Sequence, residues 1–269
     1  MFPIGPILNM HIPSVTLRRP KRGFTLIELL VVISIIGILA ALLLPALARA
    51  KVQAKVVMAK SDISELVTAI NQYHSTYGKW PARQQAYVSA ANNPNSGDFT
   101  FGTTRTDGAL LKSTYPNIIT YPLSVVPLHQ NNNSEVMGIL MDLEKFGDGT
   151  PTANVGHVRN PRRQVFLTAQ PANSTELPGI GPDGVYRDPW GNPYIISLDM
   201  NFDNNTGDGF YGTIRKKKRL PNLKPEISNS VLVWSFGPDG KVDPDPATGI
   251  NDTGKGTGAN KDNILGWEL

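Results

Sequence analysis

The stretch KRGFTLIELLVVISIIGILAALLLPALARAK, from Lys21 to Lys51, contains the longest apolar run of the chain. Its 20 uncharged residues at positions 29–48 have the length of a helix that crosses a bilayer. Two residues raise the free energy of such a helix in a membrane. Glu28 places a carboxylate at the start of the run, and Pro45 removes a helical hydrogen bond. The stretch therefore predicts a membrane-spanning helix with two features that a simple anchor does not need.

The residues that account for the net charge of the chain lie N-terminal to this run. The first 23 residues contain Arg18, Arg19, Lys21 and Arg22 but no Asp or Glu, so they account for the whole formal charge of +4. A cationic segment before a span predicts that this end stays in the cytoplasm and that the rest is exported. Without that segment the chain is neutral, and its charge gives no reason to expect a nucleic-acid partner.

The residues KRGFTLIELLVVI resemble the processing site of type IV pilins and of the pseudopilins of type II secretion. In that family a prepilin peptidase cuts between Gly and Phe and methylates the new N-terminus. The resemblance implies a leader peptide, residues 1–23, that ends at Gly23, and an N-methylated Phe24 as the mature N-terminus. It also implies that Glu28 is the assembly glutamate at the fifth mature position, and that Pro45 is the helix-loosening proline.

Physical chemistry supplies a role for Glu28 in assembly. In an apolar surrounding, its carboxylate and the new ammonium group of a neighbouring subunit would neutralise each other. Such a pair also sets the axial stagger of subunits, as a buried polar pair sets register in a coiled coil. A plain anchor whose carboxylate snorkels to the membrane surface is the alternative. At Pro45 the helical pattern continues, so we expect a kink or a melted turn there, and not the end of the helix.

An amphipathic helix is predicted after the span, in residues 49–77. Its apolar residues recur at intervals of four and three, and polar residues occupy the other faces. We expect this stripe to pack on the domain that follows, with a coiled-coil dimer as the alternative. Gly78 and Pro81 predict the helix end, so one helix should run from Phe24 to about Thr76. The stripe consists of Val52, Val56, Ala59, Ile63, Leu66, Ile70 and Tyr73.

The region 78–187 is rich in Asn, Gly, Pro, Ser and Thr, which predicts a long, loop-rich insertion. The apolar spacing in SEVMGILMDLEKF predicts a short helix near residues 134–146, with Ser134 as its cap. The segment QVFLTA, which begins at Gln164, is compatible with either a strand or a helix.

The region 188–269 has the pattern of an antiparallel sheet. The segments DPWGNPYIISLD, GFYGTI and SVLVWSFG read as strands separated by turn signals. The sequence therefore predicts an α+β fold. Its long N-terminal helix spans the membrane with the first half and packs the second half on a small antiparallel sheet domain with a loop-rich insertion.

The runs DPWGNPY and FGPDG are similar to runs in the major pseudopilin of type II secretion, a family whose C-terminal loop binds calcium. The resemblance implies Asp239 and Asp262 as calcium ligands. The loop between them is longer than in the family, which makes Asp243, Asp245 and Asp252 additional candidates. Carboxylates and carbonyls in a Gly-rich loop suit Ca²⁺. Because the chain has no cysteine, a bound cation could hold the loop where a disulfide cannot. The alternative is that Asp and Gly only form turns there.

The segment DMNFDNNTGDG is a candidate for a second cation site. Asp199, Asp203 and Asp208 offer oxygen ligands with a spacing similar to that of an EF-hand. However, Phe210 stands where such a loop has its closing glutamate.

No catalytic motif is present in the sequence, so we expect a protein that is not an enzyme. A membrane-anchored exported enzyme is the remote alternative. The resemblance implies a structural subunit that polymerises with copies of itself into a helical fibre for type II secretion. A type IV pilus subunit for adhesion, motility or DNA uptake is the other possibility, although many such pilins carry a disulfide.

The same resemblance implies the partners and the location of the chain. The partners would be a prepilin peptidase, an inner-membrane assembly platform and minor pseudopilins. The chain would cross the bacterial inner membrane once, with its N-terminus in the cytoplasm and its C-terminal domain in the periplasm. After assembly it would form part of a periplasmic or surface fibre.

Overall fold

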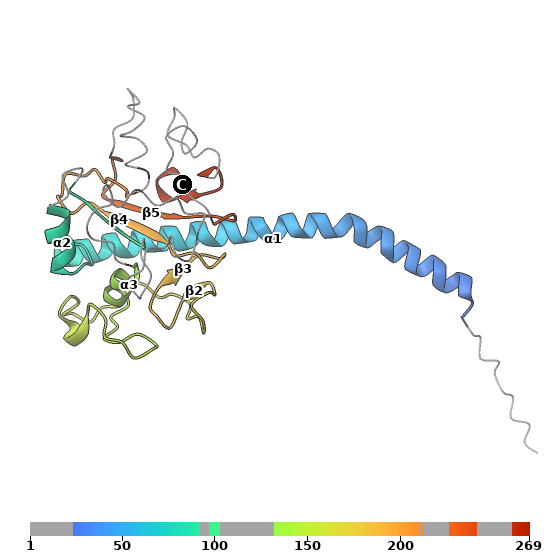
Figure 1. Cartoon of the computed structure of the whole chain (residues 1–269), viewed down its shortest axis with the longest axis horizontal. Coiled ribbons are helices and arrows are strands. Elements are labelled where there is room, and N and C mark those ends of the chain that lie inside the picture. The colour runs from blue at the N-terminus through green and yellow to red at the C-terminus, as the bar shows by residue number, and fades with distance from the viewer. Residues whose placement is uncertain (1–23, 92–96, 103–131, 210, 212–225, 241–259) are drawn as a thin grey trace, which may run out of the picture. The chain divides into compact units, whose positions relative to one another are not determined.

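The computed structural model of the chain describes residues 24–91, 97–102, 132–209, 211, 226–240 and 260–269 (Figure 1). The chain divides into two compact units, residues 1–49 and 50–269. The helices are α1 (Leu26–Tyr77), α2 (Gln84–Ala91) and α3 (Ser134–Leu140), with short 3₁₀ turns η2 (Val155–His157) and η4 (Gly266–Glu268). The strands are β1 (Phe99–Phe101), β2 (Gly179–Ile180), β3 (Tyr186–Arg187), β4 (Ile195–Leu198), β5 (Val231–Ser235) and β6 (Ile264–Leu265). A long helix and a small antiparallel sheet confirm the α+β class.

Helix α1 is a single element of 52 residues. It continues through Pro45, so the helix does not end there and the turn is not melted. Gly78 ends it, because this residue has a φ of +65° and its amide donates a 2.8 Å hydrogen bond to the carbonyl of His74. A left-handed glycine after the last turn is a common helix stop. The predicted end of the helix is therefore confirmed to within one residue.

The unit of residues 50–269 contains a four-stranded sheet with the order β1-β4-β5-β6, and each pairing is antiparallel. Strands β2 and β3 form a separate antiparallel pair. The predictions of β4 and β5 are confirmed. The strand predicted for GFYGTI is wrong at its described residues, because Gly209 lies in a turn and Tyr211 is helical; the rest of that segment lies outside the described residues.

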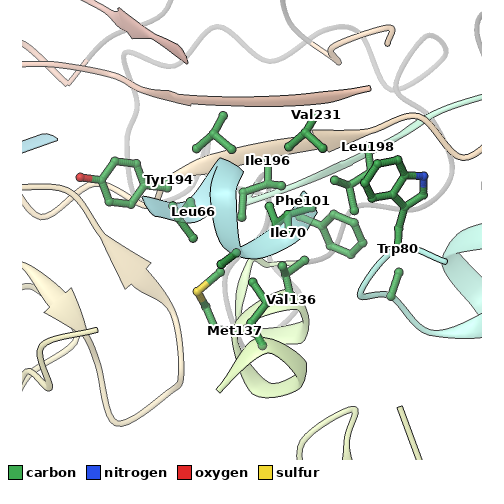
Figure 2. Packing of buried hydrophobic residues seen from close by; sticks show 14 of the residues in the cluster. Leu66, Ile70, Trp80, Phe101, Val136, Met137, Tyr194, Ile196, Leu198 and Val231 are labelled. Atoms are coloured by element: carbon green, nitrogen blue, oxygen red, sulfur yellow. The ribbon is translucent and has the colours of Figure 1, made fainter. Parts of the chain in front are cut away.

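The second half of α1 lies inside the core of residues 50–269. Figure 2 shows Leu66 and Ile70 between Ile196 and Val231 of the sheet on one side and α3 on the other. The apolar stripe is confirmed from Ala59 to Tyr73, where its members are buried. Val56 is only half-buried, and Val52 remains 40% exposed. The helix thus packs on its own domain, as its periodicity predicts.

The region 78–187 contributes more to the core than its composition indicates. It supplies α2, β1 and α3, and every residue of α3 is buried. The predicted helix is shorter than 134–146, because it ends at Leu140, and Ser134 is its first residue and not its cap. The segment QVFLTA is neither strand nor helix.

Asn133 holds α3 against the chain around the sheet. Its amide nitrogen donates 2.8 Å hydrogen bonds to the carbonyls of Tyr186 and Tyr194, and its oxygen accepts one of 2.9 Å from the amide of Tyr186. These partners are more than fifty residues away in sequence. Asn133 is the N-cap residue of α3 but makes no side-chain capping hydrogen bond to the helix. Its side chain instead fixes the position of α3 relative to the segments of Tyr186 and Tyr194.

Candidate functional site

The N-terminus of α1 is a capping box made by Thr25 and Glu28. Oε2 of Glu28 accepts hydrogen bonds from the amide of Thr25, at 2.8 Å, and from its hydroxyl, at 2.7 Å. The amide of Glu28 in turn donates a 3.3 Å bond to the Thr25 hydroxyl. A Thr followed three residues later by Glu satisfies amides that the first helical turn would leave unpaired. Glu28 therefore caps the N-terminus of its own helix.

The capping box engages only one oxygen of Glu28. Within the described part of the chain, all hydrogen bonds to this carboxylate end on Oε2, and the side chain is exposed. Oε1 can thus accept from a donor outside the helix. Thr25 is not among the residues predicted from the sequence, although the Thr-x-x-Glu spacing in front of an apolar run indicates a helix cap.

The other predicted residues of this region lie as follows. Phe24 is the first described residue and is 76% exposed, whereas Gly23 lies outside the described residues. Pro45 is exposed within α1. Since it has no amide hydrogen, it cannot pair with the carbonyl of Ala41. The helix is therefore weakened at Pro45 without being interrupted.

The first unit presents an almost entirely exposed apolar helix. Among residues 24–49, Ala40 is half-buried and all others are exposed. In the described part of the chain, α1 is the one helix that is long and apolar enough to cross a membrane by length and composition. An exposed apolar surface of this extent marks a contact with lipid or with other protein chains.

Asp239 and Asp262, the predicted calcium ligands, lie next to each other. The amide of Asp239 donates a 3.3 Å hydrogen bond to Oδ2 of Asp262. Oδ1 of Asp262 is buried and has no hydrogen-bond partner within the described residues. Burial, and next the negative charge of Asp239, raise the pKa of the Asp262 carboxyl. Both conditions disfavour the charged form of this carboxyl, while the positive charge of Lys261 favours it.

The turn before Asp239 packs closely on this pair. Gly237 has a φ of +69°, and a Cβ atom at this position would lie 2.1 Å from the carbonyl oxygen of Asp262. The carboxylates of Asp239 and Asp262, the second with its buried Oδ1, could supply part of the oxygen shell of a Ca²⁺ ion. The described residues supply no third acidic or histidine ligand. The candidates Asp243, Asp245 and Asp252 lie outside the described residues.

The second set of predicted ligands does not converge. Both oxygens of Asp199 accept hydrogen bonds from backbone amides, those of Asp203 and Asn204. Asp208 accepts from the hydroxyl of Ser197 and from the indole of Trp234. The three carboxylates do not form a group that could hold a metal ion. The expectation of a second cation site is therefore not supported, and Asp199 and Asp208 organise a turn and the sheet instead.

The DPWGNP loop is centred on Asp188, which is fully buried. Its carboxylate accepts hydrogen bonds from the amides of Trp190 and Asn192, both at 2.9 Å, and from the hydroxyl of Ser235 at 2.6 Å. Burial raises the pKa of Asp188 to about 6, although these hydrogen bonds oppose the rise. The sequence motif therefore has a structural role, because it ties the loop to β5.

Comparison with known proteins agrees with the geometry at the N-terminus. The Prokaryotic N-terminal methylation motif matches residues 18–44. The type II secretion system core protein G of Pseudomonas aeruginosa is 42% identical over 77 residues, which is 29% of this chain and 54% of that protein. The protein of the same name from Aeromonas hydrophila is 38% identical over 79 residues, 29% of this chain and 55% of that protein.

Pilins are similar to the chain as well. The type IV major pilin protein PilE1 of Neisseria gonorrhoeae is 36% identical over 94 residues, 34% of this chain and 42% of the pilin. The chain thus spans about half the length of the relatives it matches. No solved structure matches it. The chain carries the N-terminal methylation motif of pilins and pseudopilins, and it is similar to type II secretion core protein G and to type IV pilins.

Proposed function

We propose that the chain is a structural subunit that is stored in a membrane and polymerised into a fibre of the type II secretion kind. A prepilin peptidase would cut after Gly23 and methylate Phe24. The first half of α1 would hold the subunit in the bacterial inner membrane, with residues 50–269 on the periplasmic side. The observation that carries this proposal is the methylation motif on a capped, exposed and apolar helix.

Glu28 would link one subunit to the next. Its Oε2 keeps the helix cap, while Oε1 receives the ammonium group of a neighbouring Phe24. In lipid or in a fibre core this pairing removes the cost of two isolated charges. Pro45, which lacks one backbone hydrogen bond, would let the helix adjust between the membrane and the fibre. An inner-membrane assembly platform and minor pseudopilins would supply the remaining contacts.

The loop with Asp239 and Asp262 would bind calcium in this subunit. The support is the buried Oδ1 of Asp262 without a partner in the described residues and the hydrogen bond that the amide of Asp239 donates to the Asp262 carboxylate. The ion would offset their repulsion and hold the C-terminal loop. Thermal unfolding of the full chain in detergent, with calcium and with a chelator, tests this. We expect a lower midpoint with chelator, and an unchanged midpoint would refute the calcium proposal.

A type IV pilus subunit is the second candidate function, because PilE1 is among the relatives. The absence of cysteine favours the secretion fibre, since no disulfide can close the C-terminal region. Complementation separates the two. A strain that lacks its major pseudopilin should regain secretion when it expresses this chain, whereas a strain that lacks its major pilin should remain without pili. The opposite pattern would establish the pilus function.

Processing and assembly can be tested separately at Glu28. The chain is expressed with a prepilin peptidase and an assembly system, and wild type is compared with Glu28→Ala. Loss of leader cleavage is measured by the mass of the N-terminus, and fibre formation by shearing and electron microscopy. We expect cleavage to persist and fibres to be lost. Glu65→Ala, which removes another exposed glutamate of α1, is the matched control and should assemble. Normal fibres from Glu28→Ala would refute the charge-pairing mechanism.

A further inference from the structure

The turn of residues 155–165, here called the arginine turn, has an exposed surface that is both apolar and cationic. Between positions 149 and 175 the chain contains three arginines and no acidic residue. Within the described part of the chain, the arginines of this turn make no ion pair. Exposed valines beside arginines are typical of a surface that contacts another protein. The exposed side chains of the turn include Val155, Val158, Arg162, Arg163 and Val165.

Hydrogen bonds to α1 hold the arginine turn in place. The hydroxyl groups of Tyr73 and Tyr77 donate 2.6 Å hydrogen bonds to the carbonyl of Arg159 and to Oδ1 of Asn160. The guanidinium group of Arg162 lies over the ring of Tyr77, 5.8 Å from its centroid. The turn therefore lies at the C-terminal end of α1, and its surface is ordered before any partner binds.

A cluster of side chains fixes the start of the same turn. Nδ1 of His157 lies 2.8 Å from Oδ1 of Asp142, and its Nε2 lies 2.6 Å from Oε1 of Glu144. Oδ1 of Asp142 also accepts a 2.9 Å hydrogen bond from the side-chain amide of Asn154. The two carboxylates after α3 are thus directed to His157 and not to the arginines.

The loop of residues 174–177, here called the glutamate loop, has the opposite charge. Glu176 is exposed, and Leu177 beside it is 51% exposed. The amide of Glu176 donates a 3.2 Å hydrogen bond to the hydroxyl of Ser174, but its carboxylate makes no ion pair with any described residue. This apolar and anionic surface is complementary in charge to the arginine turn.

The two surfaces lie toward opposite ends of the second half of α1. The carbonyl oxygen of Glu176 lies so close to Gly191 that a Cβ atom there would be 2.5 Å away from it. Trp190, the neighbour of Gly191, has Nζ of Lys55 over its ring at 5.8 Å. The arginine turn, in contrast, bonds to Tyr77. At about 1.5 Å per residue, Lys55 and Tyr77 are separated by roughly 33 Å along the helix.

We propose that the arginine turn of one subunit binds the glutamate loop of the next copy of the chain. Because the two surfaces lie at opposite ends of one compact unit, they meet between copies and not within one. Such a head-to-tail contact generates an open helical filament when its rotation does not close a ring. The region 78–187 thereby supplies a contact between subunits in addition to the one at Glu28. This inference rests on the proposed function, because it places the contact in the fibre.

Introduced thiols report this contact selectively, because the chain has no cysteine. The double variant Arg163→Cys/Glu176→Cys is expressed with a prepilin peptidase and an assembly system, and sheared fibres are treated with a short bifunctional thiol crosslinker. A crosslinker is used because a disulfide forms only between closely spaced Cα atoms. We expect a ladder of covalent dimers, trimers and longer products.

The single variants are the internal controls of this experiment. Each should remain monomeric, and fibres that contain both single variants should stop at dimers, because a head-to-tail contact joins unlike residues. The matched control is Arg163→Cys/Asp148→Cys. Asp148 is an exposed acidic residue outside both surfaces, so this pair should give no ladder.

Charge reversal tests whether the two surfaces attract each other. Arg163→Glu and Glu176→Arg should each lower the fibre yield, normalised to processed subunit, roughly tenfold, because like charges opposed in an interface weaken binding by at least this factor. The two reversals combined should restore most of the yield, whereas Asp148→Arg should not change it. The exchanged side chains are exposed, so the unfolding midpoint of each processed subunit in detergent should equal that of wild type.

Three results would overturn the contact and leave the proposed function intact. One is fibres without a ladder, both from the first double variant and from one with Arg162→Cys in place of Arg163→Cys. Another is crosslinked dimers from Arg163→Cys alone, which would show that like surfaces meet. The third is a combined charge reversal that restores no yield. If the cysteine-free parent forms no fibres in the assembly system, the proposed function and this contact are both wrong.

Discussion

The carboxylate of Glu28 accepts two hydrogen bonds from Thr25 through the same oxygen, at 2.8 Å and 2.7 Å. This relationship gives the glutamate two separable tasks, a local cap through Oε2 and a contact between subunits through Oε1. An amide side chain can replace the carboxylate in a capping box, but it cannot neutralise an ammonium group. The two tasks can therefore be tested with two different substitutions.

We predict that Glu28→Gln abolishes fibre formation although it keeps the cap, because the charge is lost. Thr25→Val removes the capping hydroxyl and keeps the charge. The loss of a cap costs about 1 kcal/mol, so this variant should still assemble, in reduced amount. Fibre yield after shearing, normalised to processed subunit, measures both effects. A higher yield from Glu28→Gln than from Thr25→Val would mean that the cap, and not the charge, carries assembly.

A second prediction concerns Asp188, whose pKa is raised to about 6 by burial. The folded chain then holds this proton up to a higher pH than the unfolded chain, in which an Asp titrates near 3.9. Stability from this group therefore falls as the pH rises from about 4 to about 6 and is level above that. Relative to Asp188→Asn, wild type should lose about 3 kcal/mol over this range.

Urea unfolding followed by tryptophan fluorescence measures this difference, since all four tryptophans lie in residues 50–269. Asp148→Asn is the control with the opposite sign. Hydrogen bonds from Thr150 lower the pKa of Asp148, which is fully exposed, so its small contribution should disappear as the pH falls. A pH-independent difference between wild type and Asp188→Asn would contradict the prediction.

The sequence predicted best those features that depend on neighbouring residues. The stripe from Ala59 to Tyr73 and the strand β5 follow local periodicity, and the structure buries them accordingly. The Thr25–Glu28 cap is local too and could have been read from its spacing. The strand β1 was missed because its three residues acquire their conformation by pairing with β4.

Contacts between distant residues were not accessible from the sequence. Asn133 bonds to two tyrosines more than fifty residues away, and His157 reaches two carboxylates across a turn with unusual backbone angles. Neither has a pattern of residue types that indicates its partner. The resemblance implies Asp239 and Asp262 as calcium ligands, and in the structure the amide of Asp239 donates a hydrogen bond to the Asp262 carboxylate.

A third prediction tests the position of α1 in the core. Leu66 is fully buried between the sheet and α3 (Figure 2), so Leu66→Ala should cost about 2–5 kcal/mol by loss of burial and by the cavity it leaves. Val57 lies on the same helix but is 65% exposed. Val57→Ala should change the free energy of unfolding by no more than about 0.5 kcal/mol. Urea unfolding of the full chain in detergent distinguishes the two, and similar costs would mean that α1 does not pack as described.

The last prediction separates backbone conformation from close contact at two glycines. Gly78 and Gly237 have nearly the same φ, +65° and +69°, so an alanine at either position has the same left-handed penalty of about 1–2 kcal/mol. A Cβ at Gly78 meets nothing within 4 Å, whereas at Gly237 it would lie 2.1 Å from the carbonyl oxygen of Asp262. Gly237→Ala must therefore displace the segment that carries Asp262, and it should lower the unfolding midpoint by clearly more than Gly78→Ala.

If calcium binds at Asp239 and Asp262, Gly237→Ala should also reduce the difference between midpoints with calcium and with chelator, while Gly78→Ala should leave that difference unchanged. Equal effects of the two variants would show that the turn at Gly237 can move away from Asp262 without cost.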